Sequence, residues 1–86
     1  MDRKKILGIP ADHSLEHVGS RMRGTLQQTD IDEYEERDAT GKPVAKHVFT
    51  ADTSIKAPFG TTHSFVSYDM EGKPLCQNTT FDPARY

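Results

Sequence analysis

The stretch Asp38-Ala-Thr-Gly41-Lys-Pro-Val44 decides the fold, because it predicts a tight reversal of the chain. An Asp at the first position of a four-residue turn can accept a hydrogen bond from the backbone two residues on, and a Gly at the fourth position adopts a positive φ without steric cost. A second copy of the pattern, Asp69-Met-Glu-Gly72-Lys-Pro-Leu75, occurs further along the chain. Each copy is therefore predicted to form the tip of a β-hairpin.

The residues on both sides of each predicted turn favour strands. β-Branched and aromatic side chains, which strands prefer, recur in all four flanking stretches. These stretches are Ile31 to Arg37 and Val44 to Thr50 around the first turn, and His63 to Tyr68 and Leu75 to Phe81 around the second. Two such hairpins predict a four-stranded antiparallel sheet.

The N-terminal part of the chain is predicted to add one short helix to this sheet. A short strand from Lys4 to Ile9 is expected to end at Pro10. After it, apolar residues recur at helical spacing and Asp12 is a suitable N-cap, so a helix from about Ala11 to Val18 is expected. The predicted fold class is α+β, with a short N-terminal helix packed on a four-stranded antiparallel sheet built from two hairpins.

The chain has 86 residues and is interpreted as a single small domain, residues 1–86, with four residues each of Leu, Ile, Val and Phe. A domain of this size buries only about 60% of the surface that its unfolded chain exposes. Its stability is therefore expected to be marginal, and pairing with a second copy as a homodimer, or with a partner protein, is predicted to increase it. The predicted core consists of Ile6, Ile9, Leu15, Val18, Met22, Leu26, Val44, Val48, Phe49, Ile55, Phe65, Val66, Leu75 and Phe81.

Composition argues against several functional classes. The net charge is -2 and Lys and Arg form no large cluster, whereas nucleic-acid-binding proteins usually present a positive face, so nucleic-acid binding is kept only as an alternative function. The single Cys76 excludes an internal disulfide. Residues Ile6 to Ile9 form an apolar run too short for a signal peptide or a membrane span. A cytoplasmic protein with no membrane association is expected.

One motif is typical of a metal site. His13, Glu16 and His17 fit the pattern H-x-x-E-H, in which two His side chains one helical turn apart bind zinc and the Glu activates water. The pattern has only three fixed positions, and a catalytic zinc needs a further ligand and a shaped cavity. A metal-dependent enzyme or a metal-binding protein is thus an alternative function, and an exposed, solvated helix start is the other interpretation of these residues.

The stretch Asp52 to Thr62 between the predicted hairpins is expected to be a long loop. Loops of about a dozen residues are more often functional than shorter ones. This loop and the residue after it provide the predicted binding residues Lys56, Phe59, Thr61, Thr62 and His63.

Apart from H-x-x-E-H, the chain lacks the common sequence patterns for catalysis. It contains neither a nucleophile elbow nor a phosphate-binding glycine motif. Asp52 could form an acid and base pair with His47 or His63, but nothing in their spacing predicts that they meet. No catalytic residue and no cofactor is assigned, and the chain is interpreted as a non-catalytic binding or accessory module that acts through protein–protein contacts.

Overall fold

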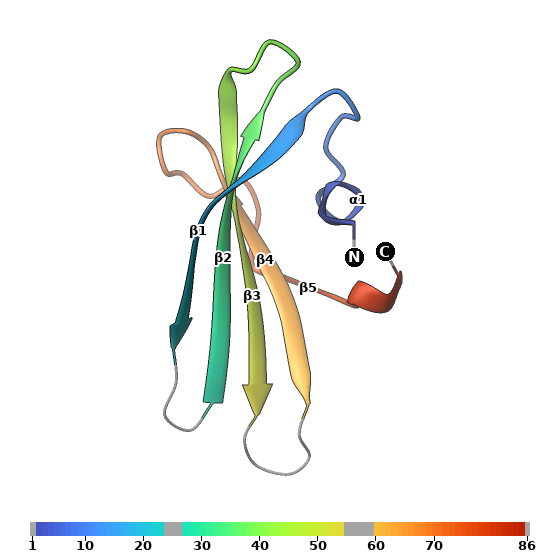
Figure 1. Cartoon of the computed structure of the whole chain (residues 1–86), viewed down its shortest axis with the longest axis vertical. Coiled ribbons are helices and arrows are strands. Elements are labelled where there is room, and N and C mark those ends of the chain that lie inside the picture. The colour runs from blue at the N-terminus through green and yellow to red at the C-terminus, as the bar shows by residue number, and fades with distance from the viewer. Residues whose placement is uncertain (1, 24–26, 55–59, 86) are drawn as a thin grey trace.

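An antiparallel sheet of five strands makes up most of the protein (Figure 1). The computed structural model describes residues 2–23, 27–54 and 60–85. The strands neighbour one another in chain order, and each neighbouring pair is antiparallel. The predicted antiparallel sheet with one short helix is confirmed, but the predicted number of four strands is wrong. The elements in order are α1 (Arg3–Leu7), β1 (Ser14–Arg23), β2 (Gln27–Arg37), β3 (Pro43–Ser54), β4 (Thr61–Tyr68), β5 (Thr79–Phe81) and the short 3-10 helix η1 (Pro83–Arg85).

Both predicted turns reverse the chain. Gly41 and Gly72 have φ values of 86° and 88°, in the left-handed region that glycine adopts without a steric penalty. Asp38 Oδ1 accepts hydrogen bonds from two backbone N–H groups of its turn, at 2.9 and 3.1 Å. Asp69 Oδ1 accepts two in the same way, both at 2.9 Å. The turn chemistry expected from the sequence is therefore confirmed at both positions.

The chain after the second turn forms less strand than the sequence predicts. A strand is expected from Leu75 to Phe81, but only β5 pairs with β4. Before β5, a single bridge joins Tyr68 to Pro74. Pro74 has no N–H to donate to a ladder, which limits pairing at this end of the sheet. The other three predicted strands are confirmed, and each is longer than expected.

The stretch from Lys4 to Ile9 is predicted as a strand, but its first four residues belong to the helix α1. The Asp2 side chain accepts hydrogen bonds from the backbone N–H groups of Lys4 and Lys5, at 3.1 and 3.3 Å. At the other end, Gly8 has a φ of 68° and its N–H bonds back to the carbonyls of the helix. These two caps satisfy end groups that a five-residue helix cannot satisfy by itself. The strand prediction is wrong because it was based on the apolar run alone and did not include the capping residues Asp2 and Gly8.

The predicted helix from Ala11 to Val18 is also wrong, because β1 covers most of this stretch. β1 pairs with β2 from Ser14 opposite Arg37 to Arg23 opposite Thr29. A ladder of this length satisfies far more backbone groups than a helix of two turns, whose formation in isolation is unfavourable. Tertiary pairing therefore overrides the helical spacing of the apolar residues.

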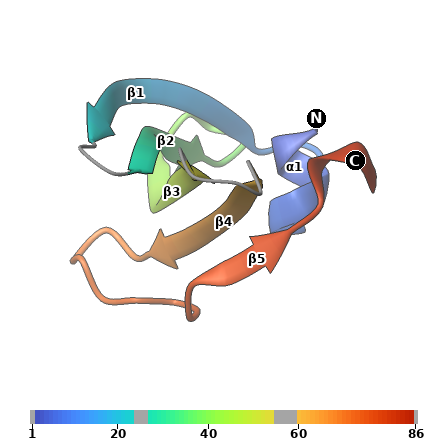
Figure 2. The same ribbon diagram turned by 90° about the horizontal axis from the view of Figure 1, so that it is seen from below.

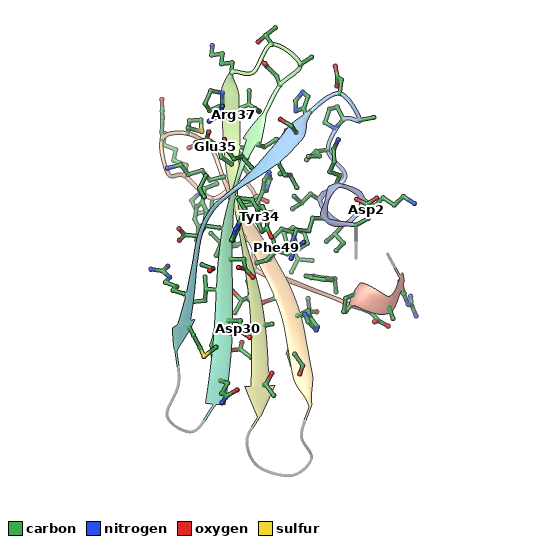
Figure 3. All side chains as sticks on the ribbon, in the orientation of Figure 1. Asp2, Asp30, Tyr34, Glu35, Arg37 and Phe49 are labelled. Atoms are coloured by element: carbon green, nitrogen blue, oxygen red, sulfur yellow. The ribbon has the colours of Figure 1, made fainter. Side chains whose placement is uncertain are left out.

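The sheet curves around α1, which lies against its concave face (Figure 2). The guanidinium carbon of Arg3 lies 4.8 Å from the ring centre of Tyr34 and 5.5 Å from that of Phe49. Tyr34 and Phe49 lie near the middle of the sheet (Figure 3). Phe49 also packs against Phe65 and Phe81, with ring centres 5.7 and 5.8 Å away. Cation–π and aromatic contacts thus hold α1 and β5 against the concave face.

The hydrophobic core is thin. Among the described residues, the buried apolar side chains are Ile31, Ala45 and Phe49. Phe49 confirms the predicted core, whereas Val18, Met22 and Leu75 are more than half exposed and contradict it. The predicted core residues that are half-buried are Ile6, Ile9, Leu15, Val44, Val48, Phe65, Val66 and Phe81. The two that lie outside the described residues are Leu26 and Ile55.

Candidate functional site

A row of polar side chains crosses the concave face on three adjacent strands. Glu36 lies on β2, His47 on β3 and Ser67 on β4, and the register places His47 directly opposite Ser67. His47 Nε2 lies 2.7 Å from Glu36 Oε1, and His47 Nδ1 lies 2.6 Å from Ser67 Oγ. The three residues are 4 to 7% exposed. Buried polar side chains need such partners, and here each of the three has one.

A second histidine completes this cluster. His13 precedes β1, and its Nδ1 lies 2.5 Å from Glu36 Oε2. The His13 side chain is 21% exposed, against 8% for that of Glu36. The carboxylate therefore joins the segment before β1 to the centre of the sheet. We call His13, Glu36, His47 and Ser67 the concave cluster.

The charge state of Glu36 follows from its surroundings. Burial raises the pKa of its carboxyl group, but hydrogen bonds from His13 and His47, together with the positive charge that these rings can carry, lower it by more, so the net pKa is below the ordinary value. Glu36 is therefore ionised near neutral pH and accepts both bonds. With His47 neutral, its Nε2–H donates to Glu36 and its Nδ1 accepts the hydroxyl proton of Ser67, an assignment that follows from the bonding partners.

Three members of the concave cluster, Glu36, His47 and Ser67, form one wall of a cavity of about 360 Å³ between the sheet and α1. Together with Thr79 they supply its polar side chains. A mostly apolar cavity with a few convergent polar groups is typical of a small-molecule site. The rest of its lining consists of Leu7, Ile9, Ala45, Phe65, Leu75 and Cys76.

The opposite, convex face of the sheet carries a smaller groove of about 300 Å³. Side chains alternate between the two faces of a strand, so residues next to the concave cluster point to this side. Val18 in the groove is 53% exposed, and none of the described helices lies on this face (Figure 2). We call the groove on this face the convex groove. Its lining includes Val18, Glu33, Lys46, Val48, Tyr68 and Gly72.

The structure separates the three residues of the predicted metal motif. His13 contacts Glu36, His17 Nε2 lies 3.2 Å from Asp32 Oδ1, and Glu16 Oε2 lies 2.8 Å from an Arg37 nitrogen. The motif requires the spacing of a helix, but His13 directly precedes the strand β1, and Glu16 and His17 belong to it. Within residues 2–23, 27–54 and 60–85, no group of three or more His, Cys, Asp or Glu side chains is placed to hold a metal ion.

The predicted binding loop is shorter than expected. Its first and last residues belong to β3 and β4, because the hairpin extends to Ser54 and resumes at Thr61. Of the predicted binding residues, Lys56 and Phe59 lie outside the described residues, whereas Thr61, Thr62 and His63 begin β4. Their role in binding stays a prediction.

The three residues considered as an acid and base pair also have separate partners. His63 packs on Phe81, with ring centres 5.8 Å apart. Asp52 accepts a hydrogen bond from Thr29 Oγ1. His47 bonds to Glu36 and Ser67. No hydrogen bond joins Asp52 to either histidine in the part of the chain that the structure describes.

Sequence reasoning missed the concave cluster, although one signal pointed to it. The turn sets the register of β2 on β3, with Glu36 opposite Ala45 and Tyr34 opposite His47, so Glu36 and His47 are diagonal neighbours on one face of adjacent strands. Ser67 cannot be placed in this way, because its neighbour on β3 depends on the register between β3 and β4, whose connection is longer than the first turn.

Comparisons of the chain with protein-family models, with curated proteins and with solved structures found no match. None of the described helices has the length and apolar character needed to cross a membrane. The candidate sites are therefore judged on their geometry alone.

Proposed function

We propose that the protein is a binding module that acts through protein–protein contacts, with the convex groove as its binding surface. The observation that supports this proposal is the convex groove, over which no described helix lies and where Val18 is 53% exposed beside the half-buried Val48 and Tyr68. Apolar groups that remain accessible on one face of a sheet mark a surface that a partner can cover.

The groove also offers charges of both signs at its rim. Glu33 and Lys46 line it together with Val48, and Glu33 lies directly opposite Val48 in the register of β2 and β3. An apolar centre with a charged rim is the usual arrangement of a protein interface. The partner that fits this surface is a protein segment with an exposed apolar side chain flanked by an acidic and a basic residue.

Site-specific photo-crosslinking tests this proposal. A photoreactive amino acid at position 48 is expected to form a covalent adduct with a partner protein in cells that express the chain. Val44 is the matched control, because it lies on β3 and the same face, is also half-buried, and does not line the groove. Val18→Lys is expected to weaken the adduct at position 48. Equal adducts at positions 44 and 48, or an adduct that Val18→Lys leaves unchanged, would contradict the proposal.

We propose hydrolysis of a small ester as a second candidate function, supported by the order of hydrogen bonds in the concave cluster. A hydroxyl bonded to a histidine that is itself bonded to a carboxylate is the arrangement of an activated nucleophile. In this reaction Ser67 Oγ attacks the carbonyl carbon, His47 Nδ1 takes the hydroxyl proton and passes it to the departing alkoxide, and water then hydrolyses the acyl group.

A fluorophosphonate probe tests the second candidate. It is expected to phosphonylate Ser67, and the label should disappear in Ser67→Ala. Ser64→Ala is the matched control, because Ser64 is also buried on β4, at 5% exposure. It belongs to the opposite face and should leave the label unchanged. A wild-type protein that stays unlabelled would rule out this function and leave the proposed role of the convex groove unaffected.

A further inference from the structure

The outer edge of β1 has no neighbouring strand in the part of the chain that the structure describes. β1 is the first strand in the sheet order, and only its inner edge pairs, with β2. Among residues 14–22, seven have exposed side chains, and only Leu15 and Gly19 are half-buried. An open edge of this length presents a row of free backbone N–H and C=O groups, which is a template for another strand.

A β-bulge in β1, where the register with β2 shifts between His17 and Gly19, gives this strand a self-complementary pattern. Leu15 and His17 before the bulge lie on the concave face. Ser20 and Met22 after the bulge lie on the same face. Opposed residues in an antiparallel pair must share a face. A second copy of β1 can pair antiparallel with the first about a two-fold axis that passes between residues 18 and 19. This pairing sets 15 opposite 22, 16 opposite 21 and 17 opposite 20, and the two members of each pair share a face.

The same alignment also pairs side chains of matching character. Glu16 lies opposite Arg21 of the second copy, and symmetry repeats this contact. Both side chains are accessible, at 55 and 58% exposure. Leu15 lies opposite Met22, which is 68% exposed in the single chain. Opposite charges and apolar pairs directly across an antiparallel ladder both stabilise it.

We infer that β1 pairs antiparallel with β1 of a second copy of this chain, so that two five-stranded sheets become one continuous sheet. The partner is a second copy because the pattern complements itself. This pairing covers the open edge and adds stability to a chain with a thin core. It uses the backbone edge of β1, which adjoins the convex groove at Val18, and it goes beyond the proposed function.

Charge reversal tests the pairing by sedimentation velocity over a range of protein concentrations. The wild-type chain is expected to be a dimer. Glu16→Arg and Arg21→Glu should each raise the dissociation constant by roughly tenfold, since two attractive contacts become repulsive. The double variant should recover most of the lost affinity. Glu71→Arg in the exposed second turn is the matched control and should leave association unchanged.

Recovery of the dimer in the double variant is diagnostic, because the same two substitutions weaken contacts within one chain. Arg37 contacts Glu16, and Glu33 contacts Arg21. The double variant puts like charges at both of these contacts, so any recovery of the dimer must arise across the interface. A monomeric wild-type chain would overturn the inference, as would a dimer that the single variants leave unchanged or a double variant without recovery.

Disulfide crosslinking tests the register if the charge variants unfold. In a Cys76→Ser background, Leu15→Cys together with Met22→Cys is expected to give a covalent dimer on mild oxidation, because opposed residues lie at a distance that a disulfide spans. The two new thiols cannot pair within one strand, where seven residues span about 23 Å. Leu15→Cys alone is the control and should stay uncrosslinked. Failure of the double variant to crosslink would overturn the register, whereas the photo-crosslink at position 48 tests the convex groove independently.

Discussion

Glu36 is the residue whose loss we expect to destabilise the protein most. Glu36→Ala removes the acceptor of both histidines in the concave cluster, at contact distances of 2.5 and 2.7 Å. Leaving a buried hydrogen-bonding group without its partner costs about 1–3 kcal/mol, and more where a charged group is involved. We expect about 3 kcal/mol, because the lost acceptor is a carboxylate and His47 stays buried, whereas His13 is 21% exposed and recovers hydrogen bonds with water. A chain of 86 residues has a total stability of about 4–13 kcal/mol, so this loss is a large part of it.

Urea unfolding followed by far-UV circular dichroism measures this loss, at one fixed protein concentration because association shifts the midpoint. Glu33→Ala is the matched control. Glu33 is also on β2, but its side chain is 43% exposed and contacts Arg21 at 3.3 Å. Its removal should change the unfolding free energy by no more than about 0.5 kcal/mol. If Glu36→Ala costs less than about 1 kcal/mol, the concave cluster does not stabilise the fold as we argue.

Three further results are expected. Because the folded pKa of Glu36 is lowered, its carboxylate stabilises the fold above the unfolded pKa, and the unfolding free energy should fall as the pH drops below about 5, less steeply in Glu36→Ala. Gly41→Ala, at a φ of 86°, should lower the melting temperature by roughly 4–8 °C in calorimetry, from a cost of about 1 kcal/mol. The control Gly60→Ala, where nothing lies within 4 Å of the added carbon, should have little effect. Arg3→Ala should speed amide hydrogen exchange in α1 roughly fivefold, from about 1 kcal/mol of lost cation–π contact, whereas the exposed Lys5→Ala should not.

Local chemistry made the turns and the long strands predictable. Asp38 and Gly41 define a turn by their own hydrogen bonds and backbone conformation, without reference to the rest of the chain. The strands β2, β3 and β4 carry the residues that strands prefer, so their existence followed, and the predicted ends at Arg37 and Tyr68 are confirmed, whereas their other ends extend beyond the prediction. The N-terminal part failed for the opposite reason, because the state of Ser14–Arg23 depends on pairing with β2 rather than on its own apolar spacing.

The concave cluster shows the limit of sequence reasoning for the candidate site. Glu36, His47 and Ser67 belong to three strands, and their contacts require both the register of β2 on β3 and that of β3 on β4. A shift of one residue in either register would turn one of these side chains to the other face. His13 joins them because it directly precedes β1, whose first residue pairs with the end of β2, rather than lying on a helix.

The position of α1 has a consequence for the order of folding. The helix precedes β2 and β3 in the chain and so leaves the ribosome before them, yet its five residues are too few to be stable alone. Arg3 contacts Tyr34 and Phe49, which are synthesised much later. The helix must therefore wait for β2 and β3, and its docking belongs among the late steps of folding, after the first hairpin has formed around its turn.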